Sequence, residues 1–276
     1  MSVMSALEEH RPALLELRDS VTGQGRLART QNFLAQWCEG PLASSIESAQ
    51  ELMVFFVDGG ALPGGPAGAV IPAKSLAILP PGRHEIRAPK GSRTLILATD
   101  RQDIDPDSAL NTAQFRIDPR IAPTGEPFAR RRGEGEIHIY PMDAVKAPPG
   151  NERLKIFQST TLSINFVEYR GPRARDALSP HSHVDIEQGT LILEGQFMHH
   201  LREEWGKNAD LWREDAHLQA DAATLLRIPP KVIHTTEGVG EGTHMLLDIF
   251  SPPRRDFIAK GWVLNSGDYS DPETPQ

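Results

Sequence analysis

The chain of 276 residues contains a single cysteine, Cys38. One cysteine excludes an intrachain disulfide and a thiolate metal cluster, and it is typical of a reducing compartment. Long apolar runs are also missing: stretches such as residues 52–57 have the length of a strand, whereas a membrane-spanning helix needs about 18 apolar residues. Residues 1–20 include early acidic residues and no apolar run of signal length, so we expect a cytoplasmic protein.

Basic residues are in the minority. The chain has 29 Lys and Arg against 37 Asp and Glu, which gives a formal net charge of −8 and a pI of about 5.7. Nucleic acids and anionic membranes need a basic surface, so neither is expected as a main partner. The expected partner is a small-molecule substrate, and a homodimer is left open as the assembly.

Helical patterns are scarce after residue 23. Short runs rich in β-branched and aromatic residues follow one another, and 23 prolines and 23 glycines separate many of them. No helical pattern lies between successive runs, as a parallel α/β fold would require. The sequence therefore predicts an all-β barrel or sandwich fold. The exception is residues 5–17, where Leu7, Leu14, Leu15 and Leu17 have helical spacing and predict a short N-terminal helix.

Two pairs of segments repeat in the same order. Residues 55–59 (FFVDG) resemble 191–195 (LILEG), and residues 77–81 (AILPP) resemble 226–230 (LRIPP). In both halves an apolar strand ends in acid-Gly, and a later apolar strand ends in Pro-Pro. A duplicated barrel explains this order. We expect an N-terminal helical segment over 1–25, a first barrel over 26–140 and a second over 141–276.

Seven of the ten histidines lie at or after position 181. His181 and His183 are two residues apart, so on a strand both imidazoles point to one face. His234 follows Pro229 and Pro230 at the end of an apolar run, where a side chain can be aimed inward. Imidazole suits zinc, iron, nickel and copper. The sequence therefore predicts one mononuclear metal site in the later barrel, with His181, His183 and His234 as ligands.

The segments 181–195 and 229–234 resemble the two motifs of the cupin superfamily. The first motif is matched by His181, His183 and Gly195, and the second by Pro229 and His234. The resemblance implies two cupin-type (double-stranded β-helix, jelly-roll) barrels, with metal in the C-terminal barrel only. The family spacing places Gln188 at the remaining, usually acidic, ligand position, whereas strand parity favours Glu187, so we predict Gln188 as the ligand with Glu187 as the alternative. The sequence departs from the motifs where glycines are expected, at Arg175, Ala223 and Lys231, and it has Gly238 where Asn is expected.

The first half lacks the same ligands. Aligning Gly59 with Gly195 places Ser45 and Glu47 at the two histidine positions and Leu52 at that of Gln188. Aligning the Pro-Pro pairs places Glu85 at the position of His234, with His84 one residue away. We therefore expect a degenerate first barrel without metal.

The resemblance implies a metal-dependent enzyme, most simply an Fe(II) dioxygenase-type oxidoreductase acting on a small aromatic or acidic substrate. Zn, Ni or Mn is the alternative metal. Three imidazoles and an amide would leave a divalent ion its full charge, which favours an anionic substrate. His199 or His200 is the candidate catalytic proton carrier, although a hydrogen-bonded core histidine explains either residue as well. Ile192 and Leu226 are candidates for the pocket wall. The alternative functions are a non-redox isomerase or lyase, and a non-catalytic binding protein.

Overall fold

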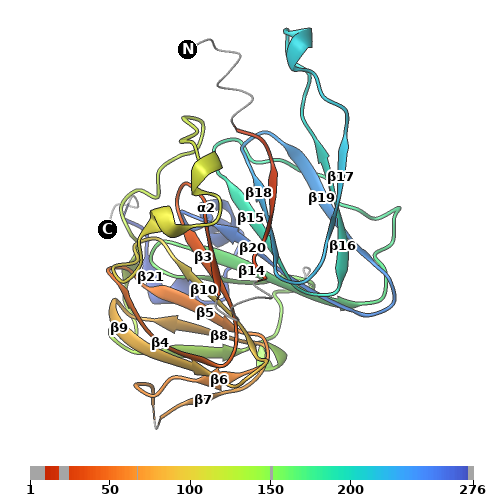
Figure 1. The fold of residues 1–276 in the computed structure, drawn as a ribbon. Helices are drawn as coiled ribbons and strands as arrows, with labels where there is room; N and C mark the ends of the chain where they lie inside the picture. The colour runs from red at the N-terminus through yellow and green to blue at the C-terminus, as the bar shows by residue number, and fades with distance from the viewer. Residues whose placement is uncertain (1–9, 19–24, 67, 150–151, 273–276) are drawn as a thin grey trace.

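A computed structural model of the protein describes residues 10–18, 25–66, 68–149 and 152–272, and over these residues the chain is built mainly of antiparallel strands (Figure 1). Four sheets form successive layers, two from each half of the chain. We call the two sheets of the N-terminal half the first barrel and those of the C-terminal half the second barrel.

The first barrel pairs a six-stranded sheet with a four-stranded one. The larger sheet has the order β12 (His138–Pro141), β8 (Ser75–Leu79), β5 (Leu52–Phe56), β10 (Arg93–Ala98), β3 (Leu34–Glu39) and β2 (Arg26–Arg29). The smaller sheet has the order β4 (Leu42–Ser48), β9 (Gly82–Ala88), β6 (Gly60–Ala61) and β7 (Val70–Ile71). Apolar side chains of both sheets, among them Ile46, Val54 and Ile86, form the core between them.

The second barrel pairs a six-stranded sheet with a three-stranded one. The larger sheet has the order β1 (Ala13–Glu16), β18 (Thr224–Ile228), β15 (Gln188–Glu194), β20 (Thr243–Phe250), β14 (Ser163–Arg170) and β13 (Lys155–Gln158). The smaller sheet has the order β17 (Ala216–Ala220), β16 (Gln196–Arg202) and β19 (Ile233–Val239). Strands β16 and β17 form a hairpin that projects from the body of the molecule, with η4 (Ala209–Leu211) at its tip (Figure 1).

Short elements complete the described chain. Strands β11 (Ala129–Arg130) and β21 (Tyr269–Ser270) pair with each other, and α2 (Arg255–Ala259) is the only α-helix within the described ranges. The 3-10 turns besides η4 are η1 (Pro106–Ser108), η2 (Thr112–Gln114), η3 (Met142–Ala144) and η5 (Ser266–Asp268). No helix of the described chain is long and apolar enough to cross a membrane.

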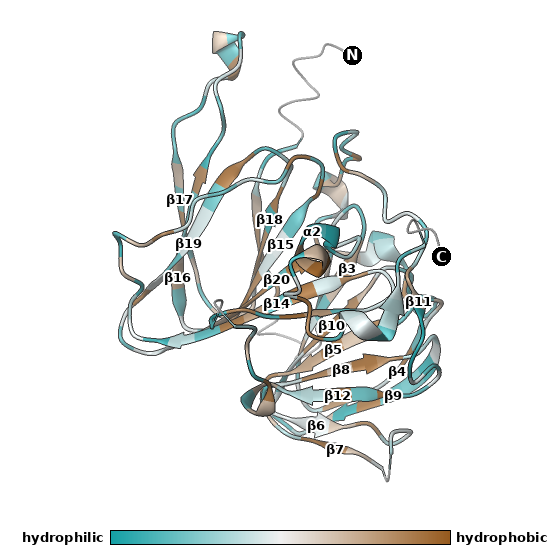
Figure 2. Cartoon of the chain, turned by 180° about the vertical axis from the view of Figure 1, so that it is seen from behind, coloured by the Kyte–Doolittle hydropathy of each residue, from teal (hydrophilic) through white to brown (hydrophobic). Residues whose placement is uncertain are grey.

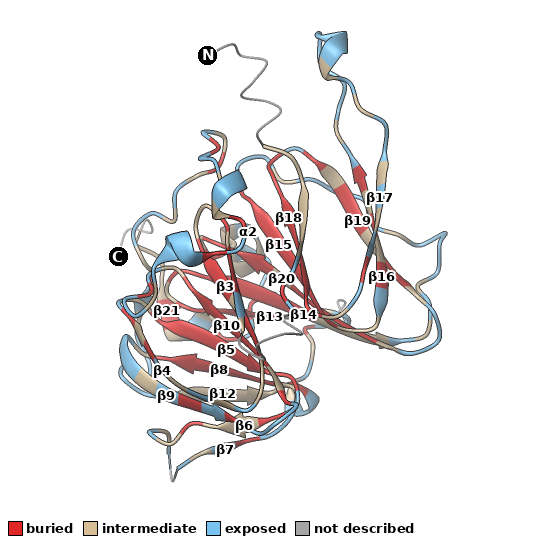
Figure 3. Ribbon diagram, in the orientation of Figure 1, coloured by how far each residue is buried: buried red, intermediate tan, exposed pale blue. Residues whose placement is uncertain are grey.

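The two six-stranded sheets pack face to face, which buries them on both sides (Figure 3). Phe55 of the first barrel stacks on Phe166 of the second, with ring centroids 5.3 Å apart. Every residue of β5 and of β8 is buried, and most of the β8 ribbon has the brown colour of hydrophobic residues in Figure 2. This arrangement explains why residues 52–57 are continuously apolar and do not alternate, because a strand buried on both faces has no polar side.

The prediction of an N-terminal helix over residues 5–17 is wrong for residues 10–17, which the structure describes. Residues 5–9 lie outside the described ranges. Residues 13–16 form strand β1, which pairs with β18 at the edge of the larger sheet of the second barrel. Leu15 packs into the core between the barrels and Leu14 into the interior of the second barrel. Leucines on opposite faces suit a strand, and the open edge of β18 supplies the backbone hydrogen bonds.

The backbone repeats between the halves as the sequence repeat predicts. Gly59 and Gly195, at the matched acid-Gly turns, have φ values of 94° and 91°. The three non-glycine residues with positive φ among the described residues are Lys74, Ala223 and Lys231. Lys74 corresponds to Ala223, and Lys231 corresponds to Gly82, whose φ is also positive. Ala223 and Lys231 replace the glycines expected in the second motif. The backbone at both positions still has the left-handed conformation that favours glycine.

Candidate metal centre

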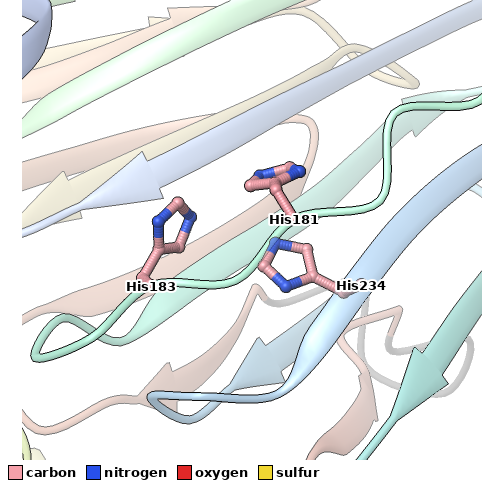
Figure 4. Close-up of side chains that lie close together, drawn as sticks. All are labelled: His181, His183 and His234. Carbon is pink, nitrogen blue, oxygen red and sulfur yellow. The ribbon is translucent and has the colours of Figure 1, made fainter.

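Three histidines from two distant segments meet at one end of the second barrel (Figure 4). His181 forms an isolated antiparallel bridge with His234 of β19, with N–O distances of 3.1 and 2.8 Å. His183 is held nearby because its carbonyl oxygen accepts the backbone N–H of Lys231 at 2.6 Å. One ring nitrogen from each of the three histidines lies within 4.8 Å of the others. Small side-chain rotations would bring them to the separation expected around one ion.

The structure brings Gln188, and not Glu187, to these histidines. Gln188 begins β15, and its amide oxygen Oε1 lies 2.8 Å from His183 Nε2 and 3.1 Å from His234 Nε2. Glu187 points away: its carboxylate pairs with Arg227 at 3.1 Å and accepts the backbone N–H of Gln31 at 2.8 Å. Burial raises the pKa of Glu187, and its ion pair with Arg227 opposes that rise.

Two of the imidazoles are held in a defined tautomer by backbone carbonyls. His181 Nδ1 lies 2.9 Å from Ser179 O, and His234 Nδ1 lies 2.9 Å from Val232 O. A carbonyl can only accept, so both Nδ1 atoms carry the proton and both Nε2 atoms keep a lone pair. Burial lowers the pKa of His234 to about 4, so this ring is neutral at neutral pH.

Hydrogen bonds on the side away from the histidines fix the orientation of the Gln188 amide. Its Nε2 donates to Thr190 Oγ1 at 2.9 Å and to Asp248 Oδ1 at 3.0 Å, and Thr190 Oγ1 donates to the same Asp248 oxygen at 2.8 Å. Burial raises the pKa of Asp248, while these donors and Asn165 lower it. With its amide nitrogen committed to Asp248, Gln188 must turn Oε1 toward the histidines. Oε1 and His234 Nε2, both acceptors, then face each other at 3.1 Å.

Two acceptors in contact are unfavourable unless a cation lies close to both. Three imidazole nitrogens and an amide oxygen form a neutral donor set that suits Mn, Fe, Ni or Zn. The residues present therefore fit a single divalent transition-metal ion.

Arg254 lies against the third histidine. Its Nη1 is 3.2 Å from His183 Nδ1, its guanidinium forms a two-point ion pair with Asp256, and the group stacks over Phe250 and Phe257. Burial, with Arg254 as the next cause, lowers the pKa of His183 to about 3. Arg254 places a positive charge beside the histidines, at the boundary of the adjoining cavity.

A cavity of about 580 Å³ opens in front of the three histidines and Gln188. The rest of its lining contains cationic, aromatic, aliphatic and polar side chains, with two carboxylates: Arg153, Leu154, Asn165, Val167, Tyr169, Arg173, Ser179, Pro180, Ser182, Thr235, Thr236, Leu246, Asp248, Phe250, Arg254, Asp256, Phe257, Lys260 and Trp262. Ile192 and Leu226, predicted to form its wall, are not among them. Both are buried deeper in the barrel, and Leu246 and Phe250 take the predicted place.

His199 and His200 do not reach this cavity. His199 points into the barrel but is completely buried, with Nδ1 2.9 Å from Thr236 Oγ1 and no hydrogen-bond partner for Nε2. His200 points to the outer face of the sheet and contacts His217. The structure therefore does not bring either predicted proton carrier to the cavity. His199 fits the hydrogen-bonded core alternative.

Arg173 was missed by the sequence analysis, although it lines the cavity. Its Nη atoms donate to Thr236 O, Ala177 O and Ser179 Oγ, and its Nε is buried without a partner. No carboxylate within the described residues forms an ion pair with it. Burial lowers the pKa of Arg173, and the nearby charge of Arg153 lowers it further. No motif distinguishes this arginine from the other arginines of its loop.

The equivalent end of the first barrel differs in strand parity. Ser45 and Glu85 are cross-strand partners, as His181 and His234 are. Their side chains are exposed, however, and Glu85 pairs with Arg87. Glu85 therefore matches His234 in its backbone position, but its side chain points outward and cannot take the place of the His234 imidazole. The inward side chain is that of His84, which lies opposite the core residue Ile46. His84 Nε2 lies 2.7 Å from Pro80 O.

No protein-family model and no curated protein matches the sequence. Solved structures do resemble the fold. A deletion mutant of Bacillus subtilis oxalate decarboxylase gives a TM-score of 0.54 at 13% identity, covering 87% of this chain and 76% of that one. Lactobacillus farciminis oxalate decarboxylase in a formate complex gives 0.53 at 14%, covering 87% and 86%. AerE from Microcystis aeruginosa gives 0.53 at 8%, covering 87% and 97%. At these identities the likeness shows the fold alone, and it confirms the predicted all-β, cupin-type architecture.

Proposed function

We propose that this protein is a metal-dependent enzyme that binds one divalent transition-metal ion through His181, His183, His234 and Gln188. Its substrate is a small molecule that carries a carboxylate, and its reaction is non-redox and of the lyase class. The observation that carries the metal site is the contact between Gln188 Oε1 and His234 Nε2, two acceptors held 3.1 Å apart by hydrogen bonds from behind.

The donor set leaves several metals open, with manganese and iron foremost. Fe(II) was favoured by the sequence analysis. Oxalate decarboxylases resemble the fold, and the Bacillus subtilis protein has Mn(II) centres, which supports manganese and a lyase reaction here. When bound, the ion would act as a Lewis acid toward a substrate oxygen. Cupin-type folds host many chemistries, so the remaining argument must come from the site itself.

The charges around the cavity favour an anionic substrate. Arg153, Arg173, Arg254 and Lys260 line it, against only Asp248 and Asp256. Asp248 is committed to Gln188 and Thr190, and Asp256 to Arg254. Arg173 keeps its charge while its partners are neutral oxygens, so a substrate carboxylate would supply the missing counter-charge.

Arg173 and Arg254 have separate roles in this proposal. Arg173 binds the carboxylate through its guanidinium. Arg254 donates toward His183 Nδ1 in the metal-free protein, which leaves the His183 proton on Nε2. If His183 Nε2 held a metal ion, its proton would have to be on Nδ1, and Arg254 Nη1 would then be available to a substrate while Nε and Nη2 stay paired with Asp256. The stacked Phe250 and Phe257 rings keep it at the cavity wall.

The test is metal analysis combined with two activity assays. Protein purified without added metal is analysed for Mn, Fe, Ni and Zn, and then each metal-loaded form is incubated with small mono- and dicarboxylates while CO₂ and other cleavage products are measured. We expect about one metal per chain to depend on these four residues, with loss of that metal and of turnover in His181→Ala and retention of both in the control His84→Ala. Full metal retention in His181→Ala would contradict the site, whereas metal binding without cleavage of any carboxylate would contradict the lyase reaction alone.

An Fe(II) dioxygenase is the second candidate. Four aromatic residues line the cavity, namely Tyr169, Phe250, Phe257 and Trp262, and they favour a planar ring in the substrate. The Fe(II)-loaded protein would then consume oxygen with a catechol, gentisate or hydroquinone compound. Oxygen uptake with such a compound, together with no cleavage of simple carboxylates, would replace the lyase proposal with this one.

A further inference from the structure

Three titratable side chains meet on the outer face of the three-stranded sheet, on the opposite side from the three cavity histidines. His200 of β16 lies directly opposite His217 of β17 in the antiparallel register, and their Nδ1 atoms are 2.7 Å apart. His200 Nε2 lies 3.0 Å from Glu237 Oε2 of β19. The group joins all three strands of the sheet, and His200 and His217 pair next to the last cross-strand pair before the hairpin loop, Leu201 and Ala216.

Glu237 determines which nitrogen of His200 can bind a ligand. A carboxylate can only accept, so His200 Nε2 carries the proton and Nδ1 keeps its lone pair. That lone pair faces His217 Nδ1. A carboxylate on the far nitrogen of an imidazole is the usual support of a metal-binding histidine, because it fixes the ring and increases its basicity. The Glu237 side chain is only 8% exposed, which gives this support a fixed position.

The surroundings leave room for an ion and for its remaining ligands. A cavity of about 220 Å³ adjoins the pair, and Asp215 lines it with His200 and His217. Asp215 lies just before β17, two residues before His217, and it pairs with Arg202. Glu237 faces Arg175 as well as His200, with N–O distances of 3.5 and 3.0 Å.

We propose that His200 and His217 form a second metal site, in which the two Nδ1 atoms bind a divalent cation such as Ni²⁺, Cu²⁺ or Zn²⁺. Metal–nitrogen bonds of about 2.1 Å require two neighbouring nitrogens about 3.0–3.4 Å apart, so the pair must open by less than about 1 Å. Water completes the coordination, with Asp215 as a further oxygen ligand once it leaves Arg202. The ion cross-links β16 to β17 near the hairpin loop.

The experiment counts bound Ni²⁺ after chelation and equilibrium dialysis of the full chain. We expect two ions for the unmodified protein and one for His217→Ala. His181→Ala/His183→Ala should also bind one, and combining these changes with His217→Ala should leave none. Glu237→Gln should weaken the second site about 10–100-fold, the usual effect of removing the partner of a liganding imidazole. The control His84→Ala should bind two.

Because His217 is exposed, its replacement should leave the fold intact, and circular dichroism checks this. If His181→Ala/His183→Ala bound no more Ni²⁺ than the triple variant, the second site would be refuted, whatever the outcome for the first. Equal Ni²⁺ binding by the unmodified protein and His217→Ala would refute it as well. If His181→Ala/His183→Ala lost one ion and kept the ion that depends on His217, the second site would be supported independently of the first.

Discussion

Replacing the buried His199 by glutamine should make the stability of the metal-free protein less sensitive to acid. His199 is 0% exposed, and only its Nδ1 has a partner, Thr236 Oγ1. Burial lowers its pKa to about 4, with smaller contributions from His234 and His200. In the unfolded chain the same ring takes up a proton near pH 6.5. Between these two pH values the unfolded state binds the extra proton, so acid favours unfolding.

The magnitude follows from the two pKa values. Each pH unit between about 6.5 and about 4 removes about 1.4 kcal/mol of stability through this one residue. The loss is about 2 kcal/mol at pH 5 and about 3 kcal/mol at pH 4. No discount for solvent screening is needed, because the ring is fully buried. At pH 8 the variant should be less stable by about 1–2 kcal/mol, since it loses packing and fits the site less well. At pH 5 the two effects should nearly cancel.

Urea unfolding with EDTA present, at pH 8, 7, 6 and 5, measures this difference. Comparing the variant with the unmodified protein removes the contributions of other groups, such as Glu187 and Asp248, whose raised pKa values act in the opposite direction. Thr236→Val is the matched control: it removes the hydroxyl but keeps the buried ring, so it should retain the full pH dependence. A stability difference between His199→Gln and the unmodified protein that stays constant from pH 8 to pH 5 would refute the reasoning.

Three further changes test the site and the backbone. Thr190→Val should weaken metal binding about 10–100-fold in calorimetry without unfolding the protein, because it removes a partner of Gln188 at nearly constant shape; unchanged affinity would show that Gln188 needs no support. Arg173→Met should raise KM for a carboxylate substrate about 10–100-fold with metal content unchanged, as expected for a lost charge-assisted hydrogen bond. Lys231→Gly should stabilise the protein by about 0.5–1 kcal/mol, because it relieves a φ of 69°, whereas Lys90→Gly, outside the positive-φ set, should destabilise it. Thermal unfolding distinguishes these two signs.

The sequence repeat predicted the fold well, because the repeated residues lie where the backbone restricts which residue types fit. Turns with positive φ and strands buried on both faces leave strong marks in a sequence, and the matched segments fall in equivalent strands. Leu52 pairs with Leu79 in the first barrel, and Gln188 pairs with Ile228 in the second, which are the positions that the two alignments equate. The all-β, cupin-type fold could therefore be predicted, as could the meeting of His181, His183 and His234.

Other features left an ambiguous signal or none. The N-terminal strand β1 could not be predicted, since its leucines fit helical spacing almost as well as alternation, and only the open edge of β18 decides between them. For Gln188 the family spacing was the signal, while strand parity favoured Glu187; the ion pair that holds Glu187 away joins it to Arg227, which is distant in sequence. Arg173 is an ordinary loop arginine until the fold places neutral oxygens at its guanidinium, where no described carboxylate forms an ion pair with it.

Strand parity separates the two barrels at the positions that the repeat aligns. A shift of one residue turns every side chain of a strand to the opposite face. In β19 the inward positions include His234 and Thr236, whereas in β9 they are His84 and Ile86, although the preceding Pro-Pro pairs align. In the first barrel the inward imidazole at this position is that of His84. It lies opposite Ile46, and its Nε2 is hydrogen-bonded to Pro80 O. Substituting ligands at the aligned positions Ser45 and Glu85 would place them in solvent, so a second internal site in this chain would first require a change of register.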